Sequence, residues 1–214
     1  MRQEQVNQIY SRNARFYNWM DEPMERRYGA KIRPLMFEGL EGSKMIEVGA
    51  GTGKSFPFYP RNAVVTAIEP SRGMRELAAQ NAAKLGVAER VTLVDADVQN
   101  LPYPDSSFDA ALASFVFCSV ADPVKGLQEL HRVLRPGGVL RLLEHQRPPN
   151  RFLAALFDLF NPLVSRMVGA NINRDTTNNV KLAGFTGVNA RPLDKMAIVR
   201  YIEATRVASA TTYA

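Results

Sequence analysis

The chain has 214 residues, of which 46% are hydrophobic and 22% are charged, as expected for one soluble globular domain with a full core. The single cysteine, Cys118, excludes an internal disulfide, the first residues lack the apolar core of a secretory signal, and no apolar run could span a bilayer. The net charge of +6 is concentrated in residues 145–214, which contain nine Lys and Arg and four Asp and Glu. Such a segment can bind an anionic partner, either nucleic acid or a negatively charged membrane. An ordinary basic surface explains the charge equally well.

Residues 2–20 are predicted to form an amphipathic helix, with Arg12 and Arg15 on its polar face. The apolar and aromatic positions on the other face are Val6, Ile9, Tyr10, Tyr17 and Met20. Such a helix suits a membrane surface, a lid over a bound cofactor, or both. We therefore expect a lid or membrane-contact segment over residues 1–40 and the main domain over residues 41–214.

From residue 44 onward, short apolar runs alternate with helical stretches, which is typical of a parallel sheet with crossover helices. Strands are expected over 44–50, 63–70, 90–97, 108–120, 139–145, 187–193 and 197–207, and helices over 71–86, 123–138 and 176–185. The pattern predicts an α/β fold, a doubly wound seven-stranded sheet with one antiparallel strand. Ligands of such sheets bind at the carboxyl ends of the strands. The expected tips are Glu47 to Gly53, Glu69, Asp97, Ser114 to Cys118, and Glu144 with His145.

The loop EVGAGTGKSFPF, residues 47–58, is compatible with three ligand classes. A nucleotide-triphosphate loop needs a glycine where Val48 stands, and its magnesium carboxylate is missing because Asp109 begins a strand. A dinucleotide fingerprint needs its third glycine where Lys54 stands. Both classes are therefore disfavoured.

The series Glu47-x-Gly49-x-Gly51-x-Gly53 resembles motif I of class I S-adenosylmethionine-dependent methyltransferases. Glycines let the backbone approach the cofactor, and an acidic strand end suits its cationic methionyl part. Ala50 stands where that family commonly has cysteine.

Two further segments extend the resemblance over residues 45–147. Glu69, followed by Pro70, ends the second strand, where a carboxylate can accept both ribose hydroxyls. The stretch ADVQNLPYPDSSFD resembles the family's acidic loop, which implies that Asp97 accepts the adenine amino group and the Val98 N–H reaches the ring. Ser114, at the tip of the fourth strand, completes the expected cofactor contacts, whereas His131, in mid-helix, is expected to be structural.

The flanking segments bear on the methyl acceptor. Tyr10-x-x-x-Ala14-x-x-Tyr17 resembles a segment of quinone C-methyltransferases that closes over the donor, which implies that both tyrosines contact the cofactor. The apolar segment 151–169, which Pro162 is expected to interrupt, could line an acceptor channel, dip into a membrane or be a buried core helix. Arg174, beside a helix start at residues 176–177, is a candidate phosphate site, with ordinary capping as the alternative.

The whole chain is similar to the compact bacterial phospholipid N-methyltransferases, and FVFCSV, RVLRPGGVL and LEHQRP also resemble membrane-associated thiol S-methyltransferases. These resemblances imply methylation of phosphatidylethanolamine towards phosphatidylcholine by a cytoplasmic protein peripheral on the inner membrane, with anionic lipids as partners. A quinone or thiol acceptor is the alternative, and a non-catalytic membrane-binding module with a vestigial pocket is the third hypothesis. No nucleic-acid substrate is expected, because no Asn/Asp-Pro-Pro-Tyr/Phe motif follows the fourth strand.

Methyl transfer to an amine needs no metal, and none is expected. The amine must lose a proton before attack, and His145 and Tyr17 are the candidates for accepting or orienting it. Tyr10, His145 and Arg174 are the expected acceptor contacts. The oligomeric state is left open.

Overall fold

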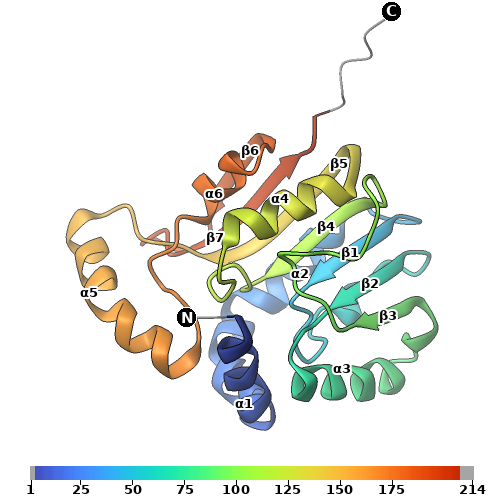
Figure 1. Cartoon of the computed structure of the whole chain (residues 1–214), viewed down its shortest axis with the longest axis horizontal. Helices are drawn as coiled ribbons and strands as arrows, with labels where there is room; N and C mark the ends of the chain where they lie inside the picture. The colour runs from blue at the N-terminus through green and yellow to red at the C-terminus, as the bar shows by residue number, and fades with distance from the viewer. Residues whose placement is uncertain (1–2, 208–214) are drawn as a thin grey trace, which may run out of the picture.

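The computed structural model describes residues 3–207; the side chains of residues 13, 15–21, 24, 28 and 30 lie outside the description. Seven strands form one sheet in the order β3-β2-β1-β4-β5-β7-β6, with helices around it (Figure 1). The strands are β1 (Lys44–Val48), β2 (Val64–Ile68), β3 (Val91–Val94), β4 (Phe108–Ser114), β5 (Leu134–His145), β6 (Thr186–Pro192) and β7 (Val199–Thr205). The longer helices are α1 (Gln3–Met24), α2 (Ala30–Phe37), α3 (Arg72–Lys84), α4 (Pro123–Val133), α5 (Arg151–Val168) and α6 (Thr176–Leu182). The short ones are a π-helix (Glu25–Gly29) and two 3₁₀ turns (Phe56–Phe58 and Ala88–Arg90).

The sheet confirms the doubly wound prediction. Strand β1 pairs in parallel with both β2 and β4, and β7 runs antiparallel between β5 and β6. The chain order reverses between β1 and β4, which opens a crevice at the carboxyl ends of these strands.

The core lies on both faces of the sheet. Successive side chains of a strand point to opposite faces, so Met45 and Ile46, both fully buried, belong to different clusters. Helices α4 and α6 cover the face of Ile46, and α2 and α3 cover the face of Met45. The sheet is thus held from both sides, and its strand ends are fixed in place.

Helix α1 is present, as predicted, and extends four residues beyond residue 20. Val6 and Ala14 are buried, whereas Arg12 is exposed. The side chains of Arg15, Tyr17 and Met20 lie outside the described residues, so the amphipathic character of the whole helix stays a prediction. The division at residue 40 also stays one.

Strand β5 begins at Leu134, five residues before the expected start at residue 139. Leu134 pairs with Phe108, and the register then shifts, so the Pro-Gly-Gly stretch bulges within the strand. A side chain at Gly138 would place its Cβ 2.8 Å from the Arg135 carbonyl oxygen, which explains the glycine.

Helix α5 runs unbroken from Arg151 to Val168, so the expected interruption at Pro162 is wrong. A proline removes one intrahelical hydrogen bond, and both ends of this helix are well capped. The Asn150 carboxamide oxygen accepts the N–H groups of Phe152 and Leu153, and Gly169 ends the helix at a φ of 77°. No helix within residues 3–207 is long and apolar enough to cross a bilayer.

Candidate functional site

A cavity lies at the carboxyl ends of β1, β2 and β4, under the first turns of α1. Because most of the expected cofactor contacts line it, we call it the cofactor cavity. Eight of the eleven expected cofactor contacts line it: Tyr10, Gly49, Gly51, Glu69, Pro70, Asp97, Val98 and Ser114. Additional lining residues from α1 and from the loop after β4 include Gln3, Val6, Asn7, Phe115, Val116 and Ser119. The structure therefore brings together residues that are far apart in the sequence.

The glycine loop forms one wall of this cavity. Gly49 has a φ of 64°, and a Cβ there would lie 2.4 Å from Cγ2 of Val116. The Gly51 N–H donates to Oε2 of Glu69 at 2.8 Å. Gly53 does not line the cavity; a Cβ there would lie 2.4 Å from the Phe56 ring. Two glycines thus shape the cavity, and the third permits close packing beside it.

Glu47 lies elsewhere than expected. Its buried carboxylate accepts a hydrogen bond from the Tyr59 hydroxyl, and it does not line the cavity. Burial raises its pKa, opposed by Ser55, Tyr59 and Arg33. Arg33 in turn donates to Ser55 Oγ at 2.9 Å and pairs with Glu25 at 2.8 Å. Glu47 therefore ties the glycine loop to the core, and its contact with the cationic part of a cofactor stays a prediction.

Glu69 is buried at the edge of the cavity. Its Oε2 accepts the Gly51 N–H and its Oε1 accepts the Ser71 N–H, both at 2.8 Å. Burial raises its pKa, and these two hydrogen bonds oppose the shift. A carboxylate oxygen can accept two hydrogen bonds, so each oxygen of Glu69 has one acceptor position left for a ribose hydroxyl.

Asp97 links the acidic loop to the lid through two glutamines that sequence reasoning missed. Its Oδ2 accepts the Gln99 amide at 2.9 Å, and the Gln99 Oε1 accepts the Asp122 N–H at 2.9 Å. Gln3, in the first turn of α1, accepts the Ala121 N–H at 2.9 Å. No local pattern signals a contact between residues 96 or more positions apart, such as Gln3 and Gln99.

Helix α1 is held closed over the cavity. The Tyr10 hydroxyl lies 2.8 Å from Ser119 Oγ, and Ser11 Oγ lies 2.9 Å from Ser71 Oγ. The helix approaches α3 closely at Gly73, where a Cβ would lie 2.8 Å from the Ser11 carbonyl oxygen. The Tyr17 side chain lies outside the described residues, so its contact with the cofactor and its role in proton transfer stay predictions.

His145 ends β5 but does not line the cofactor cavity. Its ring packs against Phe115, with 4.6 Å between the ring centroids, and Phe115 does line the cavity. Phe115 therefore separates His145 from the cavity. Its roles in proton transfer and acceptor binding stay predictions.

Arg174 lines a small side cavity that shares Val6, Ser119 and Val120 with the cofactor cavity. Its Nη2 donates to the Val120 carbonyl at 3.1 Å, and burial lowers its pKa. The Asp175 carboxylate caps the start of α6 by accepting the Asn178 N–H at 3.0 Å, in line with the capping alternative. An acceptor contact by Arg174 itself stays a prediction.

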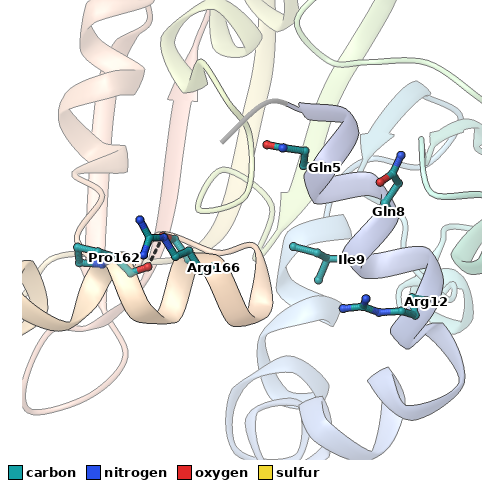
Figure 2. A pocket seen from close by; sticks show the side chains of 7 residues that line it. Gln5, Gln8, Ile9, Arg12, Pro162 and Arg166 are labelled. Carbon is teal, nitrogen blue, oxygen red and sulfur yellow. Dashed lines mark hydrogen bonds between the residues drawn. The ribbon is translucent and has the colours of Figure 1, made fainter.

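A third cavity opens to solvent between α1 and α5 (Figure 2). Its volume is about 820 Å³, and it shares Ser165 with the side cavity. Arg12 on α1 and Arg166 on α5 lie on opposite walls, together with Ile9 and Pro162. Ser165 lines both this cavity, which we call the α1–α5 cleft, and the side cavity, and three residues line both the side cavity and the cofactor cavity. The three cavities are therefore neighbours, and we call them the row of cavities from the α1–α5 cleft to Glu69.

The described residues fit S-adenosylmethionine, which supplies a methyl group on a positively charged sulfur when it is bound. Glu69, Asp97 and Val98 line the same cavity, so Glu69 is available for the ribose hydroxyls and Asp97 with Val98 for the adenine. Gly49 and Gly51 expose their backbone to the cavity, where a side chain would occupy space needed by the cofactor. Apart from this cradle, the chain's task is to align an acceptor with the methyl group, since in-line placement supplies much of the rate of such a transfer.

Comparisons with known proteins point in the same direction. Residues 46–142 match the family described as methyltransferase domain. The chain is 32% identical over 179 residues to thiol S-methyltransferase TMT1B of Mus musculus, covering 82% of this chain and 72% of that protein. It is 30% identical over 148 residues to phosphatidylethanolamine N-methyltransferase of Cereibacter sphaeroides, covering 68% and 70%.

A quinone enzyme and a solved structure complete the comparison. The chain is 30% identical over 176 residues to ubiquinone/menaquinone biosynthesis C-methyltransferase UbiE of Roseobacter denitrificans, covering 79% and 70%. A crystal structure from Thermotoga maritima, described as an S-adenosylmethionine-dependent methyltransferase and possible histamine N-methyltransferase, superposes with a TM-score of 0.70. That likeness, at 22% identity over 93% of this chain and 99% of the other, supports the fold alone.

Proposed function

Because the chain belongs to the family of S-adenosylmethionine-dependent methyltransferases, we propose that it methylates the amine of phosphatidylethanolamine, at the cytoplasmic surface of the inner membrane. S-adenosylmethionine is its cofactor. The observation that carries the proposal is the row of cavities from the α1–α5 cleft to Glu69. A lipid headgroup entering this row would reach the donor while its acyl chains stay outside the protein.

The walls of the cleft support a lipid headgroup in particular. Arg12 and Arg166 offer guanidinium groups from two sides, and guanidinium groups bind phosphate oxygens well. Ile9 and Pro162 add apolar surface beside them. A phosphodiester in the cleft would leave the ethanolamine to extend past Ser165 towards the cofactor cavity.

Ser119 lies where the side cavity meets the cofactor cavity, with Tyr10 beside it in the cofactor cavity, and we assign both residues the orientation of the amine. Ser119 lines both cavities, and its Oγ lies 2.8 Å from the Tyr10 hydroxyl. Hydroxyl oxygens accept hydrogen bonds from N–H groups, so this pair can hold an amine with its lone pair turned towards the methyl group. Neither hydroxyl needs to form a covalent intermediate.

A thiol acceptor is the second candidate, and the sequence match favours it. The thiol S-methyltransferase of Mus musculus matches a larger share of this chain than the phosphatidylethanolamine enzyme does, 82% against 68%. A thiol needs no phosphate contact, and the proton that it must lose comes from sulfur instead of an ammonium group. This candidate therefore predicts that Arg12 and Arg166 are dispensable for turnover.

The acceptor is tested by offering the purified protein methyl-labelled S-adenosylmethionine with three acceptors in parallel. These are phosphatidylethanolamine in vesicles that contain an anionic lipid, a long-chain alkanethiol in detergent, and a demethylated quinone in detergent. We expect label in the phospholipid alone, and about tenfold slower labelling when Arg12 and Arg166 are both changed to Gln. Label in the thiol or quinone, with none in the phospholipid, would overturn the proposal. A Glu69→Ala variant controls for contaminating enzymes.

A further inference from the structure

The outward face of α5 carries an unusual concentration of exposed apolar side chains. Eleven large hydrophobic residues are exposed in the described part of the chain, and five of them lie on this one helix. The five, between 52% and 73% exposed, are Phe152, Leu159, Phe160, Leu163 and Met167. Figure 1 shows α5 standing at the side of the sheet near α1. Patches of this kind mark surfaces that meet another partner.

Spacing along the helix places the five residues on one stripe, which we call the α5 stripe. Phe152, Leu159 and Leu163 are separated by seven and four positions, close to whole turns of an α-helix. Phe160 and Met167 extend the stripe along one side. Ala154, on the opposite face, is fully buried. The helix therefore turns one apolar face to the protein and a second one to the outside.

Polar contacts made by α5 residues outside the stripe fix this orientation. Asp158 pairs with Arg147 at 2.6 Å and accepts the Asn173 amide at 3.0 Å. Asn161 accepts the Ile172 N–H at 2.8 Å. Rotating α5 to bury its stripe would break these contacts, so the exposure of the stripe is built into the fold.

The charges beside the stripe complement an anionic surface. Arg151 at one end and Arg166 near the other are both exposed, and the single acid of α5, Asp158, is neutralised by Arg147. Arginine side chains can keep their charge at lipid phosphates while an apolar face enters the acyl region. In an antiparallel pairing of two α5 helices, by contrast, Arg151 of one copy would face Arg166 of the other. The charges thus favour a bilayer over a second copy of the chain.

We propose that the α5 stripe is the membrane-binding surface and that it enters the acyl boundary of an anionic leaflet as an interfacial helix. The inference rests on the proposed function and deepens it. Pro162, Ser165 and Arg166 of α5 also line the α1–α5 cleft, so binding by the stripe would place the mouth of the cleft at the lipid headgroups. The acceptor would then move from the leaflet into the row of cavities without crossing bulk water.

The test is flotation of the full-length protein with vesicles that contain phosphatidylcholine and phosphatidylglycerol but no phosphatidylethanolamine, without cofactor. Because no acceptor is present, the result does not depend on which acceptor the enzyme uses. The double variant Leu159→Ser with Leu163→Ser weakens the stripe. The matched control, Leu85→Ser with Leu182→Ser, removes two leucines that are exposed elsewhere.

We expect the wild-type protein and the control to float equally, and the stripe variant to float at least fivefold less. Raising salt from 50 to about 500 mM should also reduce flotation of the wild type, because it screens the arginines. Equal flotation of the two double variants would overturn the inference. So would a wild-type dimer, seen by light scattering, that the stripe variant converts to monomers. Circular dichroism melting of both variants establishes that they are folded.

Discussion

Glu144 lies at the carboxyl end of β5, fully buried behind the loop that lines the cofactor cavity. Its Oε1 accepts the N–H groups of Val116 at 2.8 Å and Phe117 at 3.0 Å. Its Oε2 finds no hydrogen-bond partner within residues 3–207. Burial raises the pKa of this carboxyl from 4.5 to about 7, although the backbone N–H groups oppose the shift. Glu144 thus fixes one wall of the cavity at an electrostatic cost.

This raised pKa predicts a pH-dependent stability. Between pH 4.5 and 7 the folded protein keeps a proton on Glu144 that the unfolded chain has lost. The contribution of this proton to the free energy of unfolding is therefore fully present below pH 4.5 and is lost as pH rises through 7. The loss amounts to about 3 kcal/mol. Urea unfolding at pH 5 and pH 8 should show that the free energy of unfolding falls more for the wild type than for Glu144→Gln. Equal falls in the two proteins would contradict the assignment.

Glu69 and Asp97 are the residues on which cofactor affinity depends most. Replacing either by alanine should weaken binding of S-adenosylhomocysteine by about 1–3 kcal/mol, since each loses hydrogen bonds to the ligand. Isothermal titration calorimetry measures the change. Asp105→Ala is the control, because Asp105 is exposed and pairs with Arg132 away from the cavity. Unchanged affinity in both test variants would mean that the cofactor binds elsewhere.

At the scale of elements, α1 connects the cofactor cavity with the outer cleft. Its residues line all three cavities, and Tyr10 and Ser119 join it to the loop after β4. Tyr10→Phe and Ser119→Ala should each speed release of bound S-adenosylhomocysteine about fivefold, as expected for the loss of about 1 kcal/mol. Stopped-flow measurement of the single and double variants forms a double-mutant cycle. If the hydroxyls act together, the double variant releases no faster than either single variant; multiplied effects would refute the contact.

The elements also show what the sequence could predict. The strands, α3 and α4 follow from local apolar periodicity, and Ser71 and Asp122 cap the two helices as their residue types suggest. The early start of β5 at Leu134 could not be predicted, because it depends on pairing with Phe108. The unbroken α5 could not be predicted from Pro162 either, because the helix is capped at Asn150 and Gly169, far from the proline in the sequence.

The candidate site was predictable in part, and for a similar reason. Motif spacing placed Gly49, Gly51, Glu69 and Asp97 at strand ends that the fold brings together. It could not say which way a side chain turns, and Glu47 turns towards Tyr59 instead of the cavity. The link from Gln99 to Gln3 joins distant segments and leaves no local trace.

At the scale of the molecule, we expect the core of the sheet to fold without α1. Among the side chains that the structure describes, none from α1 belongs to the two apolar clusters of the sheet, although α1 forms a wall of each cavity. Removing residues 1–20 should therefore lower turnover at least 100-fold while thermal unfolding remains cooperative. Turnover and differential scanning calorimetry on the same sample decide this. A truncated protein that keeps its turnover would exclude α1 from the site.

The most direct measurement of the central claim is lipid mass spectrometry on a bacterial host whose membrane contains phosphatidylethanolamine and no phosphatidylcholine. Expression of the protein should produce phosphatidylethanolamine with one or more methyl groups on its amine. The same protein carrying Glu69→Ala and Asp97→Ala should produce none. If the headgroups stay unmethylated while the purified wild type binds S-adenosylhomocysteine, the enzyme is a methyltransferase for another acceptor, and the lipid assignment is wrong.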